Sequence, residues 1–120
     1  MSSDFNEEKL DKRLEELRYL EAEELAQLLA SRHGLPYADL SKSAINTDAL
    51  RLVPEPEARA GNLATFKMLG KKVEMAVTSP TSDKVKNVIK DLQDKTLVVN
   101  LSLVSESSLK HAWERYAEIS

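Results

Sequence analysis

Residues 34–61 carry three of the four prolines and two of the three glycines of this 120-residue chain. Their sequence, GLPYADLSKSAINTDALRLVPEPEARAG, has almost no periodicity typical of a long helix or strand. A connection of this length inside a small domain is uncommon, and it usually marks a functional segment, disorder or short elements that are easily missed. We call this segment the connector. It confines the longer elements to the residues before and after it.

The residues before the connector have the pattern of two amphipathic helices. Over residues 4–17, Phe5, Leu10, Leu14 and Leu17 keep to one helical stripe among charged residues. After a break at residues 18–20, a second helical pattern continues to residue 33, where Gly34 stands at the position of a left-handed cap. We expect this second helix to turn the following residues inward: Ala22, Leu25, Ala26, Leu28 and Leu29. The two helices are predicted to pack as a pair.

The connector itself is predicted to be ordered. An extended stretch at residues 35–40 precedes a helix of one or two turns from Thr47 or Asp48, which Pro54 ends. Residues 55–60 can form another short helix, for which Gly61 is the stop. Apolar side chains are expected to hold these pieces on a core: Leu35, Tyr37, Leu40, Ile45, Leu50, Leu52 and Val53.

The rest of the chain reads as a ββαβα unit. Apolar runs at 63–68 and 73–77 flank Leu-Gly-Lys-Lys and predict a hairpin. Ser82 caps a predicted helix at 83–93, residues 96–103 form the clearest strand, and Ser105 caps a last helix. The inner face of that helix is Leu109, Ala112, Trp113 and Tyr116. The predicted class is α/β (α+β), ordered α-α-β-β-α-β-α, with a small three-stranded sheet and helices on one face.

Length and composition predict one cytosolic domain over residues 1–120, divided into a helical part (1–33), the connector (34–61) and the ββαβα part (62–120). The absence of cysteine excludes thiol catalysis and thiolate metal sites. No targeting or membrane-spanning segment is evident, so we expect no direct membrane insertion. Residues 1–60 carry 8 basic and 13 acidic residues, a net charge of −5, and residues 61–120 carry 9 and 7, a net charge of +2.

We expect no catalytic, cofactor or metal site. The glycines at 34, 61 and 70 are too dispersed to form a phosphate loop, and His33 and His111 lack the partner of a helical metal site. Adjacent glutamates in the first helices read as solvated faces. Six lysines lie close in sequence without interleaved aromatic residues, which favours a solvated face over a nucleic-acid surface: Lys71, Lys72, Lys84, Lys86, Lys90 and Lys95.

A family resemblance rests on the connector and its surroundings. The stretch ASRHGLPYADLSKSAINTDALRLVPEPEARAGNLATF and the later VEMAVTSPTSDKVKNVI resemble the N-terminal domain of the traffic ATPases of type II secretion and type IV pilus assembly, over about residues 20–118. The motif residues are Gly34, Pro36, Tyr37, Asp39, Leu40, Pro54, Glu55 and Pro80.

This resemblance implies a non-catalytic docking domain of a hexameric ATPase whose nucleotide-binding motifs lie beyond Ser120. In the family, the domain binds the cytoplasmic part of an inner-membrane assembly protein, so the expected location is cytoplasmic and peripheral to the inner membrane. We expect the chain alone to be a monomer, without enzymatic activity, cofactor or nucleic acid. Two alternatives stay open: a cyclic di-GMP receptor domain of the same family, and an unrelated small enzyme or binding protein.

Some relatives bind cyclic di-GMP through a tandem motif. When residues 9–32 are laid on one copy of it, Lys9 replaces the leading arginine, Asp11 and Arg18 replace two glycines, and Arg32 replaces the final glutamine. Glycines let the backbone approach a ligand closely, and an acid would repel phosphate. The apolar positions of the motif are kept, so the comparison predicts the fold of the receptor without its ligand.

The docking surface is predicted on the acidic N-terminal helices. Phe5, Leu10 and Leu14 form an apolar strip that little preceding chain can cover, and charges around such a strip suit a reversible protein contact. The residues proposed for this contact are Glu8, Asp11, Glu15, Arg18 and Tyr19. The alternative is a helix that merely packs on its own domain.

Overall fold

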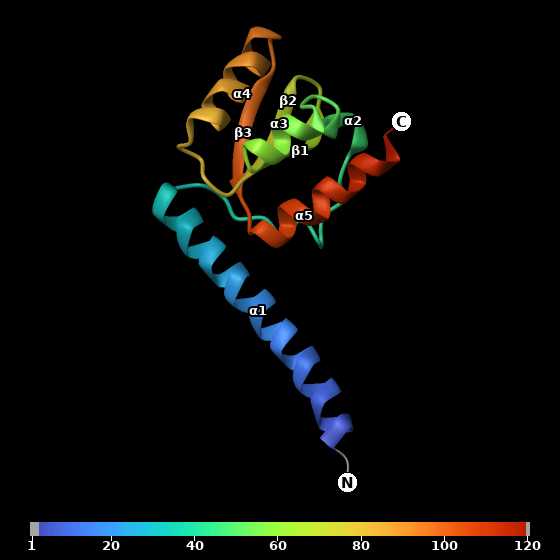
Figure 1. Cartoon of the computed structure of the whole chain (residues 1–120). Coiled ribbons are helices and arrows are strands. Elements are labelled where there is room, and N and C mark those ends of the chain that lie inside the picture. Colours follow the sequence, from blue (N-terminus) through green and yellow to red (C-terminus); the bar gives the residue numbers. More distant parts are fainter. Residues whose placement is uncertain (1–2, 120) are drawn as a thin grey trace.

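The computed structural model of the chain describes residues 3–119, and its side chains from residue 9 onward. A single long helix, α1 (Ser3–His33), projects from a body that contains all the other elements (Figure 1). With extents of 64 × 37 × 23 Å, the molecule is elongated mainly because of this helix. The N-terminal end of α1 therefore lies far from the body.

The predicted pair of helices is wrong. No glycine or proline occurs before residue 34, so nothing in the backbone chemistry at residues 18–20 interrupts the helix. The helix ends where Gly34 takes a φ of +66° and the Leu35 amide donates to the carbonyl of Ala30 over 2.9 Å. The glycine cap was predicted correctly, and the break was not.

The orientation of the second half of α1 is also different from the prediction. Ala26 is buried with 3% exposure, and Ala22 and Leu29 are half-buried. However, Leu25 and Leu28 are 58% and 69% exposed. The face that packs on the body consists of alanines, Leu29 and polar residues, whereas Leu25 and Leu28 point to solvent.

The body is built on a three-stranded sheet in the order β1-β2-β3. Strands β1 (Leu63–Leu69) and β2 (Lys72–Val77) form the predicted antiparallel hairpin, with Gly70 at a φ of +60° in its turn. Helix α4 (Asp83–Asp94) leads to β3 (Val98–Leu103), which runs parallel to β2. Helix α5 (Glu106–Glu114) and a 3₁₀ turn (Arg115–Glu118) complete the body.

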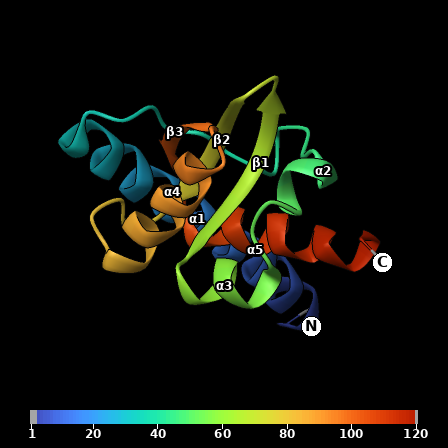
Figure 2. The same ribbon diagram turned by 90° about the horizontal axis from the view of Figure 1, so that it is seen from above.

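Both faces of the sheet are covered near the start of β1. Four successive residues, 63–66, are buried there, and side chains on a strand alternate between the two faces. The expected placement of helices on one face is therefore too simple, because the connector covers the other side. Figure 2 shows α2, α3 and α5 beside β1.

The connector is ordered and contains helices α2 (Thr47–Leu50) and α3 (Glu55–Ala60), as predicted. The amide of Asn46 donates to the carbonyl of Phe66 over 2.9 Å, and the hydroxyl of Thr65 donates to the carbonyl of Ala49 over 2.6 Å. Leu40 and Leu50 are fully buried in the main core. The long segment is thus a structural layer over β1.

Tyr116 gives the fold a dependence on alkaline pH. It is buried, and its hydroxyl donates to the carbonyl of Val53 over 2.8 Å. Burial, with the nearby charge of Glu55 adding to it, raises the pKa of Tyr116 to about 12. An unfolded tyrosine loses its proton near pH 10, so the stability linked to the protonated hydroxyl is complete below about pH 10 and is lost between about pH 10 and 12.

We therefore expect the free energy of unfolding to fall in this pH window, and to fall less steeply in Tyr116→Phe. At neutral pH, the loss of the hydrogen bond should cost this variant about 1 kcal/mol. Urea unfolding of both proteins between pH 8 and pH 12 measures the two effects. Identical slopes for the two proteins would contradict this role of Tyr116.

Candidate docking surface

The C-terminal half of α1 is fixed to the body by small residues and hydrogen bonds. Ala26 and Ala30 pack against Leu103, the last residue of β3, and Tyr37 of the connector joins this cluster. Alanine allows close approach of the helix backbone to the strand end. This contact determines where α1 leaves the body.

Glu23 is the central polar residue of this attachment. It is only 5% exposed and accepts hydrogen bonds of 2.5 Å from the hydroxyls of both Tyr37 and Ser105. Ser105 is also the N-cap of α5, where its hydroxyl oxygen accepts from the amide of Ser108. Burial, together with the adjacent Glu23, raises the pKa of Tyr37 well above its usual range. Glu23 therefore joins α1, the connector and α5.

A second set of hydrogen bonds lies one turn nearer the N-terminus. The hydroxyl of Tyr19 donates to Asp39, whose carboxylate also accepts from the amide and hydroxyl of Ser41 over 3.0 and 2.6 Å. Burial works to raise the pKa of Asp39, but the hydrogen bonds from Ser41 and Tyr19 outweigh it and lower that pKa. The hydrogen bond to Asp39 is the main cause of the raised pKa of Tyr19. The hydrogen bond from Tyr19 thus ties α1 to the connector near the point where the helix leaves the body.

The predicted docking residues lie at and beyond this point. Asp11, Glu15 and Arg18 are exposed, whereas Tyr19 is half-buried and is used in the hydrogen bond to Asp39. The side chain of Glu8 lies outside the described residues. A shallow hollow next to them is lined by Lys12, Glu15, Glu16, Tyr19 and Leu20. The structure thus brings the predicted residues onto one projecting helix, with Tyr19 at its base.

The motif residues of the connector have structural positions. Gly34 caps α1, and the carbonyl of Pro36 accepts from the amide of Leu103 over 2.8 Å, which places Tyr37 beside β3. The carboxylate of Asp39 accepts a hydrogen bond from the hydroxyl of Tyr19, and the amide of Leu40 donates to the hydroxyl oxygen of Ser108 over 3.1 Å. Two further motif residues stand before helices: Pro54 is the N-cap of α3, and Pro80 precedes α4.

Other chemistry finds little support in the described part of the chain. No group of three or more histidine, cysteine or acidic residues that could hold a metal occurs among residues 9–119. His33 and His111 are exposed in the last turns of their helices. The six lysines named above are exposed as well. Within the described residues, no helix is both long enough and apolar enough to cross a membrane.

Glu23 and Ser105 were not recognised from the sequence as attachment residues. The signal was present as a stripe of Tyr19, Glu23, Ala26 and Ala30, spaced by three or four residues. It was missed because leucine is more hydrophobic than alanine or glutamate, so the leucines were taken as the buried face of the helix. The polar partners of Glu23 come from distant parts of the chain, which helical spacing cannot reveal.

The model of the MshEN domain family matches residues 33–119. A solved structure of MshE with cdg is similar, with a TM-score of 0.67 and 26% identity, over 77% of this chain and 66% of that chain. The chain thus spans just under two thirds of that MshE chain. A structure of the N-terminal domain of XpsE in crystal form I4122 has a TM-score of 0.61 and 16% identity, over 96% of this chain and 97% of that one. No curated protein matches the chain.

Proposed function

Because this chain belongs to the MshEN domain family, found as the N-terminal domain of type II secretion and type IV pilus ATPases, we propose that it is a docking domain without catalytic activity of its own. Its partner is the cytoplasmic part of an inner-membrane assembly protein. Its location is then cytoplasmic and peripheral to that membrane. The observation that carries the proposal is the projection of α1, whose N-terminal half points away from the body (Figure 1).

We place the contact on one side of that half, defined by Glu8, Asp11 and Glu15 and called here the acidic side. Asp11 and Glu15 are exposed, and the net negative charge of the chain comes from its first sixty residues. Exposed charges steer association and fix register, so a partner with a basic surface fits this side. The hydrogen bonds of Tyr19 and Glu23 support the proposal because they hold the helix in a defined direction.

The test is a charge reversal, Glu8→Lys with Asp11→Lys and Glu15→Lys, in the full-length ATPase. We expect recruitment to the membrane fraction to fall at least about tenfold, since each former attraction becomes a repulsion. A matched control reverses three exposed acids elsewhere: Asp91, Asp94 and Glu114. Recruitment that is unchanged by the first variant at low and high salt rules the acidic side out.

Cyclic di-GMP binding is the second candidate, favoured by the similarity to MshE solved with cdg. Two observations on this chain oppose it. The family match starts at residue 33, whereas the segment laid on the ligand motif is residues 9–32. That segment also lies within α1, where Asp11 and Arg18 occupy the places of two motif glycines.

We therefore expect no saturable heat when cyclic di-GMP is titrated into the chain at micromolar concentrations. The reason is that a continuous helix with side chains at the glycine positions keeps its backbone away from a ligand. A clear titration that is lost on substitution of Lys9 or Arg18 would make this chain a second-messenger receptor.

A further inference from the structure

The side of α1 opposite its attachment to the body is covered with leucines. Each of them is between 45% and 69% exposed. We call this set the leucine stripe: Leu10, Leu14, Leu17, Leu20, Leu25 and Leu28. Successive residues of an α-helix are turned by about 100°, which places Leu10, Leu14, Leu17, Leu25 and Leu28 on one side. Glu21 lies among them, and Leu20 is about a quarter turn away. Ala26, Ala30 and Tyr19 lie on the far side.

An exposed apolar surface of this length needs an explanation, because single exposed leucines are ordinary but a row of six is not. The body does not cover it, since α1 contacts the body through the opposite face. The row extends over about five turns, the scale of a helix-to-helix contact rather than of a small-molecule site.

We propose that the leucine stripe pairs with the same stripe of a second copy of this chain, with the two α1 helices antiparallel. The stripe is almost symmetric about residue 19. When two helices cross there in opposite directions, Leu10 lies near Leu28, Leu14 near Leu25 and Leu17 near Leu20 of the other copy. This symmetric spacing of the leucines is expected for a helix that pairs with a copy of itself, and it is not required for pairing with an unrelated helix.

The charges beside the stripe select the same arrangement. Arg13 and Arg18 flank its N-terminal half, Glu24 flanks its C-terminal half, and Glu21 lies within the stripe. The antiparallel crossing places Arg13 near Glu24 and Arg18 near Glu21 of the second copy. In a parallel crossing, each of these charged residues would lie near the same residue of the second copy, so like charges would repel each other. Flanking charges of this kind set the orientation of paired helices.

The pairing is compatible with the rest of the molecule. The helix of 31 residues is about 46 Å long, so an antiparallel pair leaves the two bodies at opposite ends. Asp11 and Glu15 of the acidic side are turned away from the centre of the stripe. The pair replaces the monomer expected from the sequence, and it does not depend on the proposed docking function.

Sedimentation equilibrium of the 120-residue chain tests the proposal. We expect a concentration-dependent species of twice the 13.4 kDa monomer mass. The variants Arg13→Glu and Glu24→Arg should each weaken association at least about tenfold, since they bring like charges together. The double variant should restore it. Arg13 and Glu24 are eleven residues apart on one helix and cannot reach each other within a chain, so rescue reports on contact between copies.

Matched controls reverse a charge on another side of α1: Lys12→Glu for the first variant and Glu16→Arg for the second. Both should associate like the unchanged chain. The proposal is overturned if the chain sediments as a monomer at every concentration tested. It is equally overturned if the two single variants and their controls associate alike, which indicates a parallel pair or a contact elsewhere. Association that persists in Leu14→Asp with Leu25→Asp also contradicts it.

Discussion

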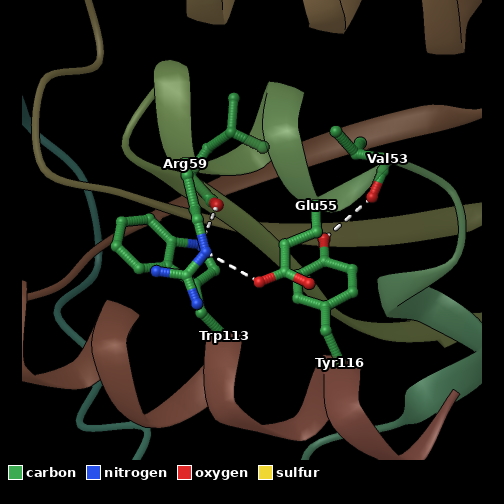
Figure 3. Close-up of polar contacts among 6 residues, drawn as sticks. Val53, Glu55, Arg59, Trp113 and Tyr116 are labelled. Carbon is green, nitrogen blue, oxygen red and sulfur yellow. Dashed lines mark hydrogen bonds and ion pairs between the residues drawn. The ribbon is translucent and has the colours of Figure 1, made fainter.

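Replacing Trp113 by alanine is expected to lower the free energy of unfolding by about 3 to 5 kcal/mol. The indole is only 9% exposed, and its Nε1 donates to the carbonyl of Leu63 at the start of β1 over 2.9 Å. The guanidinium of Arg59 lies 5.1 Å from the ring centre, and Figure 3 shows it stacked between α3 and α5. The truncation removes the buried ring, its hydrogen bond and its contact with Arg59, and it leaves a cavity beneath α3.

Urea unfolding at neutral pH measures the effect, and Trp113→Phe separates its parts. Phenylalanine keeps an aromatic ring but leaves the Leu63 carbonyl without its donor, so this variant should lose less than the alanine variant. An exposed neighbour, Glu114→Ala, is the control and should stay within about 0.5 kcal/mol of the unchanged chain. A change below about 1 kcal/mol in Trp113→Ala would show that α5 is not packed as described.

Tyr37→Ala is the second large effect, with an expected loss of about 3 kcal/mol. The ring packs with Ala26, Ala30 and Leu103, and the hydroxyl donates to the buried carboxylate of Glu23. The substitution therefore removes apolar contact and also leaves Glu23 with one fewer donor. The loss should be seen as a lower midpoint of urea unfolding.

Tyr37→Phe tests how this loss is divided. It keeps the ring contacts and removes the donor to Glu23, so we expect about 1 to 2 kcal/mol. If Tyr37→Ala left the unfolding midpoint unchanged, the connector would be a loose linker and the attachment of α1 would have to rest on other contacts.

The ββαβα part was predictable because its signals are local. Alternating apolar runs on both sides of Gly70 predicted the hairpin, and Ser82 and Ser105 are the observed N-caps of α4 and α5. Predicted strand and helix limits differ from the observed ones by one or two residues. Leu109, Ala112, Trp113 and Tyr116 are all buried as expected. Short turns and caps leave few alternatives for these elements.

Helix α1 was predicted less well because two principles compete in it. Hydrophobicity favoured burying Leu25 and Leu28, and this choice required a break in the helix to bring both apolar stripes inward. The unbroken backbone keeps one helix instead, and the attachment uses alanines with hydrogen bonds from Tyr37 and Ser105. Those donors lie 14 and 82 residues from Glu23, so no local pattern could have identified them.

The family was recognised correctly from the connector. Gly34 has a φ of +66°, and the carboxylate of Asp39 accepts hydrogen bonds from Tyr19 and Ser41, so few other residues could fill these two positions. Such positions constrain the sequence more than helix surfaces do. The docking residues on α1 could be proposed only from charge and from the apolar strip beside them, and one of them, Tyr19, is used in the hydrogen bond to Asp39.

The most direct test of the docking account is calorimetric titration of this chain with the cytoplasmic part of the inner-membrane assembly protein that serves the same secretion or pilus system. We expect saturable binding that weakens with added salt and falls at least about tenfold when Glu8, Asp11 and Glu15 are changed to lysine. The control with Asp91, Asp94 and Glu114 reversed should bind like the unchanged chain. Equal binding by the acidic-side variant and the unchanged chain would contradict the account.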